Sequence, residues 1–166
     1  MNNKSISFDG LTKTNLRLYQ KKACEMIDTS NTIIILPTGA GKTLIAACYS
    51  KKYINSNGSQ KKVLFLVPTR LLVQQQAQSV RSETNLEVAE YMGSTQRPIS
   101  FDVLVSTPSA FIFLQDNYES CKFNIFGVII FDEVHHVVKR HPYKHVARRL
   151  SVLNGQSFSP KIIGNV

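Results

Sequence analysis

Residues 31–43, NTIIILPTGAGKT, contain an apolar run, a glycine-rich turn and the start of a helical segment, in that order. This succession is the strongest indication of the fold. The run at 31–36 is short, β-branched and continuously apolar, which is typical of a strand buried on both faces of a parallel sheet. The residues after the turn, GKTLIAACYSKKYI, have a pattern typical of a helix. The stretch therefore predicts a strand–loop–helix unit of an α/β domain.

The PTGAGKT motif inside this stretch has the composition of a phosphate-binding loop. Gly39 and Gly41 allow a tight turn that directs backbone N–H groups at an anion, and the following helix adds its positive end. Lys42 would reach the β- and γ-phosphates of a nucleotide, and the Thr43 hydroxyl would ligate Mg²⁺. The common pattern GxxxxGK[ST] has glycine where this chain has Leu36, so an ordinary turn that binds nothing stays open.

The alternation of strands and helices continues along the rest of the chain. We expect further strands at 62–67, 87–92, 101–106 and 126–131, and helices at 15–27, at 70–82, after Pro108 and within 142–152. The first helix has a spacing that predicts one apolar face, made of Leu16, Tyr19, Ala23, Met26 and Ile27. This order predicts the α/β class, with right-handed crossovers and a parallel sheet covered by helices on both faces.

A second motif, GVIIFDEVHH at 127–136, places two acids at the end of an apolar strand. In open α/β sheets ligands bind beyond the carboxyl ends of the strands. Asp132 would hold Mg²⁺ opposite Thr43, and Glu133 would orient or deprotonate the water that attacks the γ-phosphate. The alternative, a zinc site made from His135, His136, His141 and His145, lacks the usual ligand spacing.

Composition limits the class of protein. The chain has 166 residues, enough for one α/β domain, and its net charge of +9 favours a polyanionic partner such as nucleic acid, although charge also serves solubility. The three cysteines, Cys24, Cys48 and Cys121, form no CxxC pair, so we expect reduced, packed thiols. No stretch approaches the roughly 20 apolar residues of a membrane span, so we expect a cytoplasmic protein, with a nuclear location open.

Together these motifs resemble the first RecA-like domain of superfamily 2 DExD/H-box helicases, a P-loop fold with a parallel sheet and helices on both faces. The matching segments are LRLYQ (16–20), PTGAGKT (37–43, including the absence of glycine at 36), VPTRLLVQQ (67–75), MGS (92–94), STP (106–108) and DEVH (132–135). FDEVHH followed by HPY (141–143) is most similar to Dicer helicase domains and RIG-I-like receptors. That resemblance implies ATP and Mg²⁺ as cofactors, double-stranded RNA as partner, and a role in RNA silencing or innate antiviral defence.

The resemblance also implies roles for individual residues. It assigns catalysis to Lys42, Asp132 and Glu133, and binding of the metal ion to Thr43 and Asp132. Contact with ATP is assigned to Arg17, Gln20, Thr38, Gly39, Ala40, Gly41, Lys42, Thr43 and Leu44. The RNA backbone would be lined by Thr69, Arg70, Gly93 and Thr107, and ATP hydrolysis would be coupled to RNA binding by His135. Backbone amides, short hydroxyls and one arginine recognise phosphates without reading bases. The basic set Lys139, Arg140, Lys144, Arg148 and Arg149 is interpreted as a solvated face rather than an RNA groove.

Domain organisation follows from the same resemblance. We expect a loosely held lead-in at 1–11 and the ATP-binding domain at 12–166, shortened at its C-terminal end so that the last strand, near 160–166, is frayed. The family works with a second RecA-like domain, absent here, whose arginine fingers are worth roughly 10³ to 10⁵ in rate, so we expect slow hydrolysis or none. Two alternatives stay open: a non-catalytic nucleic-acid-binding module, and a DExH helicase domain of the DNA-repair type.

Overall fold

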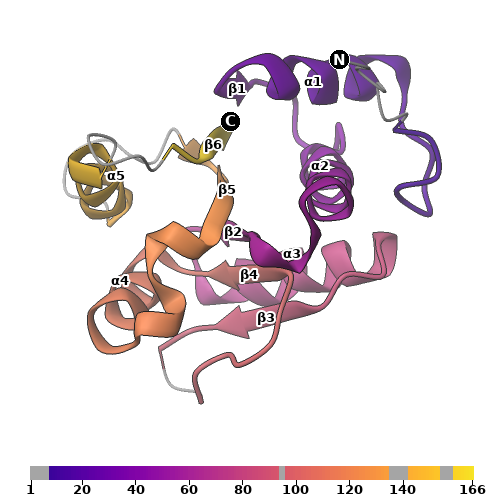
Figure 1. Ribbon diagram of the computed structural model, residues 1–166. Coiled ribbons are helices and arrows are strands. Elements are labelled where there is room, and N and C mark those ends of the chain that lie inside the picture. Colours follow the sequence, from indigo (N-terminus) through magenta and orange to yellow (C-terminus); the bar gives the residue numbers. More distant parts are fainter. Residues whose placement is uncertain (1–7, 94–95, 135–141, 154–158) are drawn as a thin grey trace, which may run out of the picture.

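The computed structural model describes residues 8–93, 96–134, 142–153 and 159–166. Among these residues six strands form one sheet in the order β1-β6-β5-β2-β4-β3, and every pairing in it is parallel (Figure 1). The strands are β1 Thr32–Ile34, β2 Lys62–Leu66, β3 Val88–Tyr91, β4 Val103–Ser106, β5 Phe126–Phe131 and β6 Lys161–Asn165. The predicted α/β class with a parallel sheet is confirmed, and all carboxyl ends of the strands lie at one edge.

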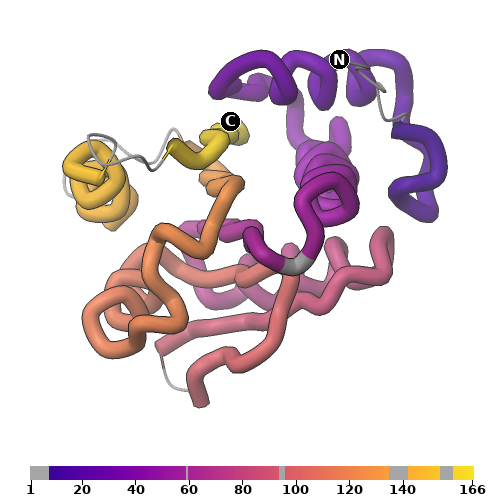
Figure 2. The backbone as a smooth tube through the Cα atoms, viewed as in Figure 1, coloured from indigo at the N-terminus to yellow at the C-terminus, as the bar shows by residue number. Residues whose placement is uncertain are grey.

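Helices cover both faces of the sheet. One face carries α1 Leu18–Thr29, α2 Lys42–Asn57 and α3 Arg70–Glu83. The other face carries α4 Pro108–Asn117 and α5 Tyr143–Leu153. Short 3₁₀ turns occur at Gly58–Gln60, Glu119–Cys121 and Phe123–Ile125. The chain trace shows α4 and α5 together on the side opposite α2 and α3 (Figure 2). The segment that joins β3 to β4 contains no helix in its described residues.

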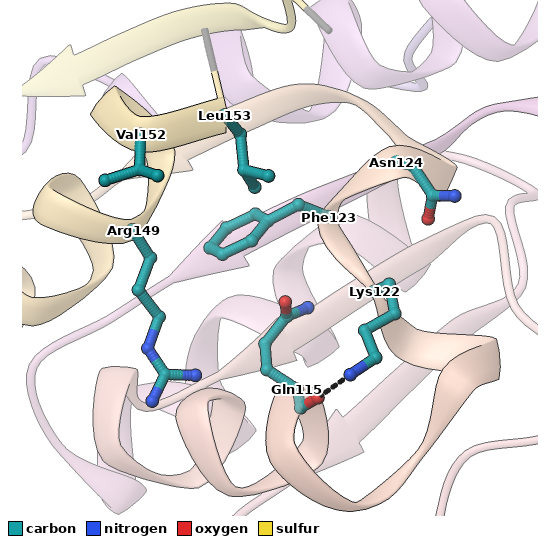
Figure 3. Close-up of a pocket in the computed structure, with 7 residues that line it drawn as sticks. All are labelled: Gln115, Lys122, Phe123, Asn124, Arg149, Val152 and Leu153. Atoms are coloured by element: carbon teal, nitrogen blue, oxygen red, sulfur yellow. Dashed lines mark hydrogen bonds between the residues drawn. The ribbon is translucent and has the colours of Figure 1, made fainter. Parts of the chain in front are cut away.

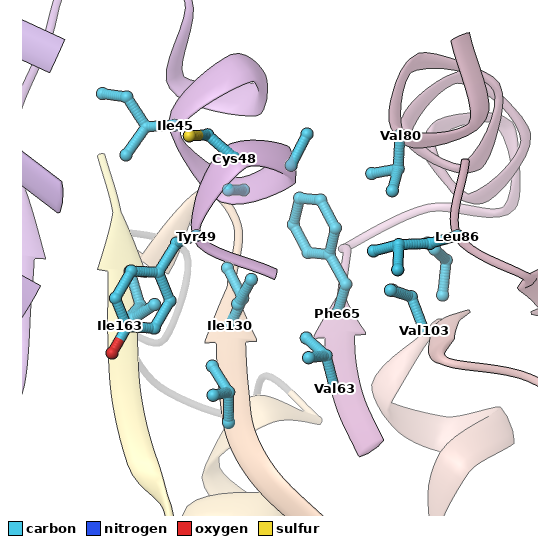
Figure 4. Close-up of a cluster of buried hydrophobic side chains, with 14 of the residues drawn as sticks. Ile45, Cys48, Tyr49, Val63, Phe65, Val80, Leu86, Val103, Ile130 and Ile163 are labelled. Carbon is cyan, nitrogen blue, oxygen red and sulfur yellow. The ribbon is translucent and has the colours of Figure 1, made fainter. Parts of the chain in front are cut away.

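Two apolar clusters, one on each face of the sheet, stabilise this arrangement. Alternate residues of β5 serve both, because Ile130 packs under α2 and α3 whereas Ile129 packs under α4 and α5. Figure 4 shows the first cluster, in which Phe65 of β2 and Ile163 of β6 lie beneath side chains of α2 and α3. Continuous apolar strands in the middle of the sheet are thus explained by burial on both faces.

Strand β1 does not have the predicted burial. Ile34 is buried, but Ile33 and Ile35 are 66% and 75% exposed, so the prediction of burial on both faces is wrong. The strand lies at the edge of the sheet and pairs with β6. On the face of Ile33, α5 leaves an apolar cavity of about 400 Å³ instead of packing against β1. A purely local apolar run cannot reveal this difference between an edge and a central strand.

Helix α1 and the residues before it bury only part of the predicted face. It begins at Leu18, and its buried residues are Gln20, Cys24 and Ile27, whereas Tyr19 and Met26 are exposed. These three positions follow the i, i+4, i+7 spacing of one helical face. The prediction is confirmed for Leu16, Ala23 and Ile27, which lie in or against the core. It was wrong for Tyr19 and Met26, because Gln20, a polar residue, is turned inward by its hydrogen bonds to the Ala40 carbonyl and the Arg17 N–H.

Both chain ends of the described structure are better held than expected. Phe8 is buried and the Lys52 ammonium lies 4.2 Å from the centre of its ring, so at this position the lead-in is packed against α2. Strand β6, expected to be frayed, lies between β1 and β5, and Ile163 is 1% exposed. The Val166 N–H donates to the Ile34 carbonyl at 2.9 Å and extends the ladder by one more bond.

Gly127 in β5 gives a test of the packing between the sheet and α2. A Cβ at this position would overlap the hydroxyl of Tyr53 and lie 2.5 Å from its Cζ atom. Gly127→Ala should therefore lower the free energy of unfolding by about 1–3 kcal/mol, measured by urea denaturation. The same substitution should cost much less in a Tyr53→Ala background and nearly as much in Tyr53→Phe, which keeps Cζ. Equal costs in all three backgrounds would contradict this packing.

Candidate nucleotide-binding site

The PTGAGKT loop joins β1 to α2 with the backbone of a tight, glycine-dependent turn. Gly39 and Gly41 have φ angles of 82° and 81°, in the left-handed region that glycine adopts without strain. Gly41 is the N-terminal cap of α2, so Lys42 and Thr43 occupy the first turn of the helix. The Ala40 N–H already donates to the Pro37 carbonyl inside the loop, at 3.1 Å. The remaining helix N-terminus is a ready anion-binding group.

Helix α1 holds this loop from the side. The Gln20 amide donates to the Ala40 carbonyl at 3.0 Å and accepts from the Arg17 N–H at 2.8 Å, and the Tyr19 hydroxyl donates to the same Ala40 carbonyl at 2.8 Å. A side chain at position 41 would overlap the Gln20 amide, which is why this residue must be glycine. Gln20, which the resemblance assigns to ATP, thus ties α1 to the loop.

The other residues assigned to the nucleotide lie around the same loop. The backbone that would approach a phosphate runs from exposed Thr38 to half-buried Leu44, whose side chain packs against the core cluster on this face. Arg17 is exposed at the start of α1, next to Gln20. The structure thus places Arg17 and Gln20, which the resemblance assigned to ATP, close to the phosphate loop.

The acid pair lies at the same edge of the sheet as the loop. Only β6 separates the loop strand β1 from β5, which places their carboxyl ends about 10 Å apart, two strand spacings. Asp132 is 5% exposed, and its Oδ2 accepts a hydrogen bond from the Gln76 amide at 3.1 Å. Burial and the neighbouring Glu133 raise the pKa of the Asp132 carboxyl, while the Asn165 amide and the Lys42 ammonium oppose that shift. Lys42 therefore lies within electrostatic reach of Asp132.

These groups suit a hydrated magnesium ion. Mg²⁺ takes oxygen ligands and keeps several waters, and a hydroxyl at Thr43 with a carboxylate at Asp132 provides protein oxygens at one edge of the sheet. The buried Asn165 amide beside Asp132 has no hydrogen-bond partner among the described residues, so polar capacity is left for a ligand. A metal–triphosphate group requires a cation near its phosphates and carboxylates near its metal, which Lys42, Asp132 and Glu133 could provide.

A clamp from α5 fixes the backbone around the acids. The fully buried Tyr143 hydroxyl lies within donating distance of two backbone carbonyl oxygens, that of Asp132 at 2.7 Å and that of Leu66 at 3.0 Å. The Leu66 carbonyl also accepts the Asp132 N–H at 2.9 Å. Glu133 follows with a φ of 53°, a left-handed conformation that costs a non-glycine residue about 1–3 kcal/mol. The clamp thus supports a turn that local preference disfavours.

Sequence reasoning missed three residues of this site. Gln76 is one of three adjacent glutamines, and only the packing of α3 turns it toward Asp132. Tyr143 belongs to the HPY segment used for the resemblance, which was the available signal, although no role was assigned to it. Asn165 had no signal in the sequence, because its significance comes from its neighbours across the sheet.

The residues assigned to nucleic acid form a row along the same edge. Thr69 follows β2 and caps α3, and Thr107 follows β4 and caps α4, each accepting a backbone N–H. Arg70 is exposed at the start of α3, and Gly93 follows β3 with a φ of 87°. Because β2, β4 and β3 are neighbours, these residues lie beside the acids and not on the loop side of the sheet.

Several assigned residues fall outside the described structure: His135, His136, His141, Lys139 and Arg140. Within the described ranges, no group of three His, Cys, Asp or Glu side chains could hold a metal ion, and no helix is long and apolar enough to cross a membrane. Cys24, Cys48 and Cys121 are buried free thiols, as expected. Arg149 on α5 pairs with Asp116 at 2.6 Å, whereas Lys144 and Arg148 are exposed.

A cavity of about 530 Å³ lies elsewhere, between the C-terminal ends of α4 and α5 (Figure 3). It is lined by Phe123 and Leu153, and Lys122 closes one side by donating to the Gln115 carbonyl at 2.7 Å. These residues precede β5 or end helices, so the cavity lies at the amino edge of the sheet. It is therefore separate from the candidate nucleotide site.

The raised pKa of Asp132 has a consequence for stability. Since the folded-state pKa lies above its ordinary value of 3.8, ionised Asp132 weakens the nucleotide-free fold at neutral pH, and this penalty vanishes below that value. Asp132→Asn should raise the melting temperature near pH 7, and the gain should shrink as the pH falls toward about 4, in scans without nucleotide or metal. Asp116→Asn is the control of opposite sign, because Arg149 lowers the Asp116 pKa. If Asp132→Asn raised the melting temperature by the same amount at every pH, the raised pKa of Asp132 would be contradicted.

Comparison with known proteins identifies the family. Residues 13–159 match the family described as type III restriction enzyme, res subunit. Endoribonuclease Dicer homolog 2 of Arabidopsis thaliana is 34% identical over 165 residues, covering 89% of this chain and 12% of the relative. Endoribonuclease Dicer homolog 4 of Oryza sativa subsp. japonica is 33% identical over 168 residues, covering 92% of this chain and 10% of the relative. The chain thus spans about a tenth of the length of these relatives.

A solved structure supports the same assignment. The Pyrococcus furiosus Hef helicase domain fits this fold with a TM-score of 0.74 and 31% identity, covering 91% of this chain and 32% of the Hef chain. The resemblance to superfamily 2 helicases, and to Dicers in particular, is confirmed. The phosphate loop and the acid pair lie at one edge of the sheet, and the family match covers most of the chain. The chain therefore belongs to the helicase family described as type III restriction enzyme, res subunit, and is a first RecA-like, ATP-binding domain similar to that of Dicers.

Proposed function

We propose that this domain binds ATP with Mg²⁺ and is the ATP-binding half of a DExH helicase or translocase that engages double-stranded RNA. The observation that carries the proposal is the meeting of the phosphate loop and the acid pair at one edge, with Lys42 in electrostatic reach of Asp132. A plain glycine-rich turn would have no reason to face a buried acid. The similarity to the Hef helicase domain supports the choice of a helicase motor.

Each residue has a physical task in this proposal. The first turn of α2 and Lys42 would hold the phosphates by charge-assisted hydrogen bonds. Thr43 and Asp132 would hold Mg²⁺, which when bound neutralises charge on the β- and γ-phosphates. Glu133 would orient the attacking water and accept its proton. We expect slow turnover by this domain alone, because the family places arginine fingers on a second domain.

The proposal of RNA as the partner rests on the row of assigned residues that follow β2, β4 and β3. Exposed Arg70 and the helix-capping hydroxyls of Thr69 and Thr107 can contact phosphates without reading bases, which suits recognition of an A-form duplex by shape. The net charge of +9 favours a polyanion. The names of the Dicer relatives, endoribonucleases, add support for RNA.

A DNA duplex is the second candidate. The Hef helicase domain, which is not a Dicer, shares the fold at 31% identity, so the fold alone does not select between RNA and DNA. The same row of phosphate-binding groups would fit either backbone. The 2′-hydroxyl and the groove shape are what separate the two duplexes.

Lys42 provides the test of the nucleotide site. Lys42→Ala removes charge-assisted bonds worth about 1.5–3 kcal/mol each, so affinity for a fluorescent ATP analogue with Mg²⁺ should fall about 10- to 100-fold. Lys22→Ala, an exposed lysine on α1, is the matched control and should bind like the wild type. Glu133→Gln should keep binding and lose turnover. Equal affinity of Lys42→Ala and wild type would refute the assigned loop.

Duplex competition tests the partner. With a labelled RNA duplex bound, unlabelled double-stranded RNA should displace it at lower concentration than DNA of equal length and sequence. Arg70→Ala should weaken binding of both duplexes and reduce the slope of log affinity against log salt by about 1. A stronger competition by DNA would move the proposal to the DNA-repair type, and an unchanged salt slope would remove Arg70 from the interface.

A further inference from the structure

Asn165 at the end of β6 is an unusual buried residue. Its side chain is 1% exposed, and neither its Nδ2 nor its Oδ1 atom has a hydrogen-bond partner. Across the described residues these are the buried side-chain nitrogen and oxygen atoms left without one. Buried polar groups are almost always paired, because leaving water without a replacement hydrogen bond costs free energy. A buried amide without a hydrogen-bond partner therefore needs a physical explanation, and the binding of a ligand is one.

The pairing of β6 places this amide between the two halves of the nucleotide site. Asn165 pairs with Ile34 of β1, just before the phosphate loop, and it follows Gly164, the partner of Phe131. It is therefore level with Asp132 of the adjacent strand.

Strand alternation gives the direction of the side chain. Ile163 packs into the core under α2, so Asn165, two residues later, points to the same face. Asp132 relates in the same way to Ile130, and its contact with Gln76 of α3 agrees with that direction. Both side chains thus face the side on which α2 begins with Lys42.

The Asp132 carboxyl is the neighbour that the Asn165 amide acts on. The amide lowers the Asp132 pKa as a hydrogen-bond donor would, although no contact between the two meets the distance and angle limits of a hydrogen bond. The Oδ2 atom of Asp132 is already bonded to Gln76. An amide in this setting can donate to a phosphate oxygen and accept from a metal-bound water.

We propose that Asn165 is a further binding residue of the nucleotide site, whose carboxamide hydrogen-bonds the terminal phosphate of ATP or a water of its magnesium ion. This inference rests on the proposed function and adds a residue outside the motifs that defined it. The amide is buried without a hydrogen-bond partner, and a bound metal–phosphate group would give it one. Asn165 thus favours binding at the expense of the stability of the free domain.

The test is a pair of measurements with opposite expected signs. Asn165→Leu replaces the amide with an apolar group of similar size, so the melting temperature of the nucleotide-free protein should rise by about 2–4 °C. Affinity for the fluorescent ATP analogue with Mg²⁺ should fall about tenfold, the loss of one hydrogen bond to a charged group. A purely structural asparagine would lower the melting temperature and leave affinity unchanged, and that result would overturn the proposal.

Further arms distinguish the two partners of the amide. If Asn165 contacts the terminal phosphate, Asn165→Leu should weaken ATP binding and leave ADP binding unchanged. If it contacts a metal-bound water, ATP and ADP should both lose affinity with Mg²⁺ and neither should with EDTA. Either pattern supports the proposal. Asn117→Leu, an exposed asparagine near the end of α4, is the control and should change no nucleotide affinity.

Failure of this inference can be told from failure of the proposed function. If wild type and Lys42→Ala bind the analogue equally, the nucleotide site itself is wrong. If wild type binds more tightly than Lys42→Ala and Asn165→Leu matches wild type, the nucleotide site stands and the role of Asn165 is refuted.

Discussion

The pairing of β6 with both β1 and β5 is the interaction on which the rest of the site depends. Because all three strands are parallel, their carboxyl ends meet at one edge and bring the loop after Ile34 next to Asp132. Residues nearly a hundred positions apart in the chain are held two strand spacings apart by backbone hydrogen bonds. Apolar packing on both faces, with Ile163 fully buried, makes this register hard to shift.

This edge of the sheet combines groups that each cost stability. Asp132 is a buried carboxyl with a raised pKa, Glu133 has a left-handed backbone, and Asn165 has no partner among the described residues. The surrounding structure offsets these costs through the buried hydroxyl of Tyr143 and the amide of Gln76, both anchored on packed helices. Strain and unsatisfied polar groups concentrate where a ligand binds, because bound charge can supply what the free site lacks.

The same edge divides into two neighbouring regions. The loop and the acids occupy β1, β6 and β5, and the assigned nucleic-acid row occupies β2, β4 and β3. The regions touch at Leu66, the last residue of β2, whose carbonyl accepts bonds from the Asp132 backbone and the Tyr143 hydroxyl. The strand that leads to Thr69 and Arg70 is therefore bonded directly to the acid turn. In the proposed function, this backbone contact would connect the ATP site with the nucleic-acid row.

Local periodicity and turn chemistry encode the order of strands and helices, the glycine turn with Lys42 and Thr43, and the acids after β5, so these features could be predicted from the amino-acid sequence. Tertiary structure decided that β1 is an edge strand, that α1 turns Gln20 inward, and that β6 is firmly held between its neighbours. It also selected Gln76 and Tyr143 as supports and left Asn165 without a partner. These features depend on contacts between distant segments, which no local pattern of residues contains.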